Sequence, residues 1–151
     1  MATDLERFKQ QLIPIFEERP EILFAYFFGS HTQERANPLS DVDIAVAIDK
    51  EKIRETDHPY GYRSHLTSFL MSALHTDRVD LVIFHEATPF LRYYILSQGV
   101  RIYSRDPNFD KRMFLEAFHH YQNTAPLRQI QEFYMKRYLR ELGEPSAHGS
   151  N

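Results

Sequence analysis

The chain has 151 residues, with 18 Lys and Arg against 21 Asp and Glu, and a formal charge of -3. This length fits one compact domain, which we expect at residues 1–142, followed by a disordered polar tail at 143–151. The acidic excess disfavours nucleic acid as the main partner, because polynucleotide binding depends on a basic surface. Zero cysteine excludes disulfides and thiol nucleophiles. We see neither a secretion signal nor an apolar run that could span a bilayer, so we expect a soluble, cytoplasmic protein with no membrane partner.

Helical and strand patterns alternate along the chain and predict a layered α/β domain with a mixed sheet and a helical C-terminal extension. Pro14 lies inside the first helical pattern, where we expect a kink or a restart. In chain order we expect a helix from Thr3 to Phe16, a strand Ile22–Phe28, one or two helical turns at 30–36, a strand Asp41–Ile48, a helix Tyr62–His75, a strand Val79–Phe84, a helix Pro89–Gln98, a short edge strand Val100–Tyr103, and helices within 107–142.

Carboxylates begin two of the predicted strands. Asp41 and Asp43 are two apart on one strand and therefore project from the same face. If the next strand, with Asp80 near its start, is a parallel neighbour joined by the crossover helix, all three carboxylates surround one spot. Anions this close need compensation by cations. Hard oxygen donors of this kind favour Mg²⁺, which also takes oxygens from substrate phosphates.

A glycine and a serine complete the constellation at the end of the first strand. Gly29 lets the backbone approach a ligand closely, and Ser30 opens the next turn, so this point predicts a site for a phosphate tail. The ten residues before Asp41 allow the chain to reverse, which predicts an antiparallel second strand. A Gly-Ser pair or an Asp-x-Asp pair alone usually has only a structural role. With residue usages of roughly 5–7% each, however, the two pairs occur together at this spacing by chance about once in 10⁵ start positions.

This constellation resembles a known family. The segment from Phe28 to Asp43 is similar to the G-S-x10-D-x-D signature of DNA-polymerase-β-like nucleotidyltransferases, and Val79-Asp80-Leu81-Val82 to their third-carboxylate strand. Within that superfamily, the small size and layout resemble the minimal nucleotidyltransferases, specifically the MntA antitoxins encoded beside HEPN-family toxins. The resemblance covers about residues 20–105, the core of the expected domain, whereas the helices at about 107–142 carry no motif of the family.

The resemblance implies a nucleotidyltransferase fold and a function. Gly29 and Ser30 would hold the β- and γ-phosphates of ATP, and Asp41 and Asp43 would bind two Mg²⁺ ions. Asp80 would ligate the metal nearest the acceptor and help deprotonate its hydroxyl. The expected reaction is transfer of AMP to a hydroxyl, with tyrosine favoured, of a partner HEPN toxin, which makes the chain the antitoxin of the pair.

Two other functions stay open. A small nucleotidyltransferase could modify a small-molecule alcohol such as an antibiotic, although this chain has little room for an acceptor pocket. A catalytically idle antitoxin could block its partner sterically, but nothing structural requires three carboxylates on adjacent strands.

Other residues carry weaker signals. Arg112 and His119 fit a loose ribonuclease pattern, but a solvated helix face explains both. His31 and Arg35 lie close enough to Ser30 in sequence to contact phosphate. An aromatic stripe on the C-terminal helices could be core against the sheet or a docking surface for a partner, and comprises Phe114, Phe118, Tyr121, Ile130, Phe133, Tyr134 and Tyr138.

Overall fold

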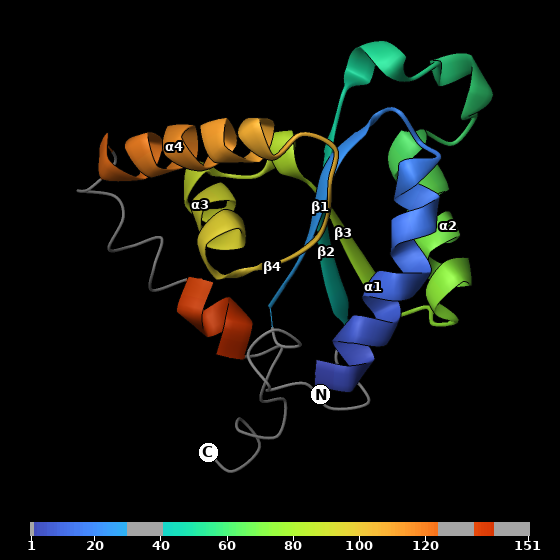
Figure 1. The fold of residues 1–151 in the computed structure, drawn as a ribbon, viewed down its shortest axis with the longest axis horizontal. Coiled ribbons are helices and arrows are strands. Elements are labelled where there is room, and N and C mark those ends of the chain that lie inside the picture. The colour runs from blue at the N-terminus through green and yellow to red at the C-terminus, as the bar shows by residue number, and fades with distance from the viewer. Residues whose placement is uncertain (1, 30–40, 124–134, 141–151) are drawn as a thin grey trace.

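A four-stranded sheet with helices on both faces forms the centre of the computed structural model, which describes residues 2–29, 41–123 and 135–140 (Figure 1). The strand order is β3-β2-β1-β4. As predicted, β2 is antiparallel to β1 and β4 is an edge strand. β3 is the parallel neighbour of β2, which was the condition for bringing the three carboxylates together, and β4 pairs with β1 in the antiparallel direction. The elements are α1 (Ala2–Glu17), β1 (Ile22–Phe28), β2 (Val42–Ile48), η2 (Lys50–Lys52), η3 (Glu55–Asp57), α2 (Tyr62–Leu74), β3 (Val79–Ile83), η4 (Phe84–Glu86), α3 (Pro89–Gln98), β4 (Val100–Ser104) and α4 (Pro107–Asn123). Residues 135–140 are also helical.

The sheet separates two hydrophobic cores, and successive side chains of β2 point alternately into one and the other. Val42, Ile44, Val46 and Ile48 face α1 and α2, whereas the intervening Ala45 and Ala47 face α3. The α1 and α2 core is aliphatic apart from a few rings and includes the fully buried Leu12, Phe16, Leu66 and Leu70. The opposite core is aromatic, because the small alanines of β2 leave space for the large side chains of β1 and their neighbours, namely Phe24, Tyr26, Phe28, Phe84 and Ile95.

The first helix differs from the prediction at both of its marked points. It begins at Ala2, so Thr3 lies inside the first turn, and it continues through Pro14 as one helix, so there is no restart at this proline. A proline removes a single helical hydrogen bond, and the fully buried Leu12 and Phe16 on either side of it hold the helix against the sheet. Among the residues that the structure describes, no helix is long and apolar enough to cross a bilayer.

The aromatic stripe of α4 packs on α3 and not on the sheet. Tyr121 stacks on Tyr93 with ring centroids 4.5 Å apart, and Phe114 and Phe118 lie 6.0 and 5.8 Å from the same Tyr93 ring. Phe118 is still 38% exposed. The stripe is therefore partly core and partly surface. Its members at 130, 133 and 134, together with the tail at 143–151, lie outside the described residues.

Candidate active site

The sheet brings the predicted carboxylates together at one end. Asp43 of β2 and Asp80 of β3 are direct partners in the parallel register. Both project on the face of the sheet that α3 covers, since Ala45 and Val82 follow two residues later and lie in that core. Asp41 is half-buried directly before β2. The antiparallel register with β1 brings the end of that strand, and with it Gly29, to the same place.

Asp43 is buried without a compensating partner. Its side chain is 1% exposed, and neither carboxylate oxygen has a hydrogen-bond partner among the residues described. Burial, together with the negative charges of Asp80 and Asp41, raises the pKa of Asp43 to about 8. A carboxylate in this position is stabilised in its charged form only when a cation is brought to it.

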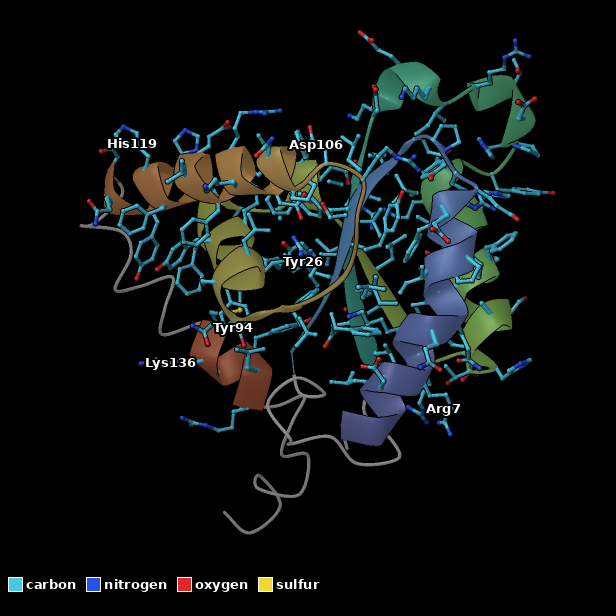
Figure 2. The ribbon with its side chains drawn as sticks, viewed as in Figure 1. Arg7, Tyr26, Tyr94, Asp106, His119 and Lys136 are labelled. Carbon is cyan, nitrogen blue, oxygen red and sulfur yellow. The ribbon has the colours of Figure 1, made fainter. Side chains whose placement is uncertain are left out.

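A second buried aspartate shows how different this environment is. Asp110 of α4 is 5% exposed, and it accepts hydrogen bonds from the Tyr26 hydroxyl at 3.1 Å and from the Ser104 hydroxyl at 2.8 Å. Arg101 lies 3.8 Å away. Figure 2 shows Tyr26 in the interior between the sheet and α4. The fold thus provides hydrogen-bond donors for the carboxylate of Asp110 and none for that of Asp43, among the residues described.

Gly29 is required by its contact with Asp43. Its φ is +83°, a conformation that side chains with a Cβ rarely adopt. A Cβ at this position would lie 2.3 Å from the Oδ2 atom of Asp43. The sequence predicted a glycine that admits a ligand, and the structure adds that the same glycine admits the buried carboxylate. Ser30, the predicted phosphate-binding partner of Gly29, lies outside the described residues.

Tyr138 is the residue at this site that the sequence did not place there. Its hydroxyl lies 3.4 Å from the Oδ2 atom of Asp80, a long hydrogen bond. Burial and the negative charges of Asp43 and Asp80 raise the pKa of Tyr138 to about 12. Tyr138 is 58 residues beyond Asp80, on a helix without a motif, so the sequence offered no signal beyond its membership of the aromatic stripe.

The residues of the ribonuclease pattern do not meet at a site. Arg112 and His119 are both exposed on α4, and the Arg112 guanidinium lies over the Phe109 ring at 5.7 Å. In Figure 2, His119 lies at the far end of α4, away from the sheet. The solvated-face interpretation therefore fits both. His31 and Arg35 lie outside the described residues.

The donors at the site suit a hard cation. Within residues 2–29, 41–123 and 135–140, no group of three or more His, Cys, Asp or Glu side chains is arranged so that it could hold a metal ion by itself. Mg²⁺ rarely uses an all-protein cage, because it keeps several waters and binds one or two carboxylates plus substrate phosphates. The two unpartnered oxygens of Asp43, next to Asp80, are oxygen donors of this kind.

Comparisons with known proteins place the chain in a family. No curated protein matches its sequence. Solved structures that match include a toxin-antitoxin complex with AMP-PNP (26% identity, 84% of this chain and 98% of the other, TM-score 0.62) and a mutant MntA-HpeT toxin-antitoxin (26%, 84% and 98%, 0.60). A complex of tri-AMPylated HEPN toxin with MNT antitoxin from Shewanella oneidensis shares the fold (24%, 86% and 98%, 0.59). The sequence model of the family described as "Polymerase beta, Nucleotidyltransferase" matches residues 10–108, about two thirds of the chain. The chain therefore belongs to the polymerase-beta nucleotidyltransferase family.

Proposed function

We propose that the protein is an ATP-dependent adenylyltransferase that transfers AMP to a tyrosine hydroxyl of a partner HEPN toxin and thereby acts as its antitoxin. The observation that carries the proposal is the convergence of Asp41, Asp43 and Asp80, with Asp43 buried and unpartnered. The similar structures support the choice of substrates, because one contains AMP-PNP, an ATP analogue, and another contains an AMPylated HEPN toxin.

Each residue of the constellation has a proposed task. Gly29 and Ser30 would bind the β- and γ-phosphates of ATP. Asp41 and Asp43 would hold two Mg²⁺ ions. Asp80 lies beside them and accepts the proton of the attacking hydroxyl. The hydroxyl oxygen attacks the α-phosphorus in line, and pyrophosphate leaves.

The metal ions would supply positive charge at the reacting phosphate. When bound, Mg²⁺ neutralises the phosphate oxygens and the charge that develops on the attacking and leaving oxygens. The contribution of the chain is to keep the donor carboxylates together at the sheet end, where Asp43 is shielded from water. General-base assistance of the kind proposed for Asp80 contributes about 10²–10⁴-fold to a rate, which sets the loss expected for Asp80→Asn.

Labelled ATP tests the proposal directly. The protein is incubated with Mg²⁺, ATP labelled at the α-phosphate and a HEPN partner, and the partner is then analysed by intact mass. We expect AMP on the partner with the wild type and none with Asp43→Asn. Asp49→Asn is the matched control, because Asp49 follows the other end of β2 and caps η2 by accepting a hydrogen bond from the Glu51 N–H, which asparagine can also do.

The same variants separate the alternatives. A steric antitoxin would still neutralise its partner as Asp43→Asn, so neutralisation that survives this substitution would refute the enzymatic mechanism. An enzyme for small molecules would label a low-molecular-weight alcohol and leave the HEPN protein unmodified, which would refute the proposed acceptor.

A further inference from the structure

The helix at 135–140 carries a tyrosine to the proposed proton acceptor. In Figure 1 this helix lies on the α3 and α4 side of the sheet, near the end where β1 finishes and β2 starts. Tyr138 reaches from it to Asp80, with 3.4 Å between the phenol oxygen and Oδ2. A tyrosine hydroxyl of this chain therefore lies at the carboxylate that, under the proposed function, deprotonates the tyrosine of the partner.

A cavity lies between this helix and the helices α3 and α4. Met135 and Leu139, one turn apart, line a cavity of about 290 Å³ together with Tyr94 of α3 and Tyr121 of α4. Figure 2 shows Tyr94 close to this helix. The contact of this helix with α3 and α4 is therefore not close-packed along its whole length. Tyr138 itself is 41% exposed, which leaves its ring open to solvent on one side.

We propose that Tyr138 is itself an acceptor, and that the protein transfers AMP from ATP to its own Tyr138 hydroxyl. This inference rests on the proposed adenylyltransferase function. The phenol oxygen forms a bond to the α-phosphorus, the bond from that phosphorus to the oxygen bridging to the β-phosphate breaks, and pyrophosphate leaves. The phenol proton passes to the Asp80 carboxylate. The product is a tyrosine–AMP phosphodiester, and no atom is oxidised or reduced.

The reaction consumes the hydroxyl that contacts Asp80, so one transfer per chain is expected. The modified Tyr138 no longer has a phenol proton to donate to the Asp80 carboxylate, and the contact between them is lost. Self-modification and transfer to a partner use the same position, so an unmodified Tyr138 competes with the tyrosine of the partner.

The experiment uses the full chain without a partner. Wild type, Tyr138→Phe, Tyr60→Phe and Asp43→Asn are each incubated with Mg²⁺ and α-labelled ATP, and the label is located by peptide mass spectrometry. Tyr60 is the control, because it is 89% exposed and so is the more accessible ring for untargeted chemistry. It follows η3, at the opposite end of the sheet from the 135–140 helix (Figure 1).

We expect one AMP per chain on Tyr138 in the wild type and in Tyr60→Phe, and loss of the label in Tyr138→Phe and Asp43→Asn. The first-order rate is expected to be independent of protein concentration, because the acceptor is in the same chain. Thermal unfolding of Tyr138→Phe confirms that removal of one hydroxyl leaves the fold intact.

A parallel reaction with the HEPN partner separates the two proposals. A wild type that labels the partner and not itself overturns the inference about Tyr138 while the proposed function stands. Label on another residue, or equal label in Tyr138→Phe, also overturns it. If neither protein is labelled, both proposals fall. Label on Tyr138 with an unmodified partner supports self-transfer and refutes the partner as acceptor.

Discussion

The close approach of Gly29 to Asp43 can be tested by adding a single methyl group. In Gly29→Ala, the new Cβ would lie 2.3 Å from the Oδ2 atom and 3.1 Å from the carboxylate carbon of Asp43. Asp43 is 1% exposed and cannot swing into water, so the carboxylate or the end of β1 must move. We therefore expect Gly29→Ala to lose both stability and AMP transfer.

The expected loss of stability in Gly29→Ala has two parts. A residue other than glycine at φ near +83° costs about 1–3 kcal/mol in backbone strain. Overpacking a buried site costs about a further 1–3 kcal/mol. The free energy of unfolding should thus fall by about 2–6 kcal/mol, measured by urea titration. The rate of AMP transfer per folded molecule should also fall, since the displaced carboxylate is a proposed metal ligand.

Gly61→Ala is the control that separates strain from contact. Gly61 precedes α2 with φ +93°, and a Cβ there would meet no atom within 4 Å. This variant should lose only the strain contribution of about 1–3 kcal/mol and keep its transfer rate per folded molecule.

A double-mutant cycle with Asp43→Ala gives the result that would refute the reasoning. Alanine at 43 removes the carboxylate and leaves the Cβ, which lies at an ordinary 3.5 Å from the added methyl. In that background, Gly29→Ala should cost no more than Gly61→Ala costs in the wild type. If Gly29→Ala costs the same with and without the Asp43 carboxylate, the contact between them has no energetic importance.

Three further predictions concern the buried acids. Without metal, folded Asp43 keeps its proton up to about pH 8, whereas the carboxyl of the unfolded chain releases its proton near pH 3.8. The free energy of unfolding should therefore fall as the pH rises between these two values, by up to about 1.4 kcal/mol per pH unit. Urea unfolding in EDTA should show this slope in the wild type, and Asp43→Asn should lack it. Mg²⁺ should raise the melting temperature of the wild type, corresponding to about 2.7 kcal/mol at 100 times its Kd, and should leave that of Asp43→Asn unchanged; an equal rise in both would remove Asp43 from the metal site. Tyr26→Phe removes one donor from buried Asp110 and should cost about 1–3 kcal/mol in urea unfolding, with the transfer rate per folded molecule unchanged.

The strand pairing around the site could be predicted because local patterns determine it. The period-two alternation indicated which residues of β2 share a face, and a crossover helix between two strands is typical of parallel strands in one sheet. The pairing of Asp43 with Asp80 follows from these two rules and is confirmed by the register. Strand ends were less accurate: β3 finishes at Ile83 because Phe84 turns into η4, where its ring packs 5.0 Å from that of Phe24.

Properties that depend on packing between distant segments could not be predicted. The burial of Asp43 depends on how closely β1, β2 and β3 pack around it. The local sequence identifies the neighbours of Asp43 along its own strand and not the residues that cover it from other strands. The contact of Tyr138 with Asp80 depends on where a helix 58 residues away folds back. The sequence left the aromatic stripe as either core against the sheet or a docking surface, because periodicity identifies an apolar face without identifying what covers it. Tyr93 of α3 provides that cover.

The position of the three carboxylates is explained by chemistry and not by stability. Two hydrophobic cores on opposite faces of the sheet supply the burial that holds the fold, and both would be compatible with an apolar residue at 43. An acid there is unpartnered and opposed by Asp80 and Asp41, so in the absence of a cation it lowers stability. The same fold surrounds Asp110 with two hydroxyl donors, which offset part of the cost of burial, and Asp43 has no such donors in the part of the chain that the structure describes. The environment of Asp43 therefore supports the proposed ligand role, since a cation carried with a nucleoside triphosphate matches both its charge and its oxygen donors.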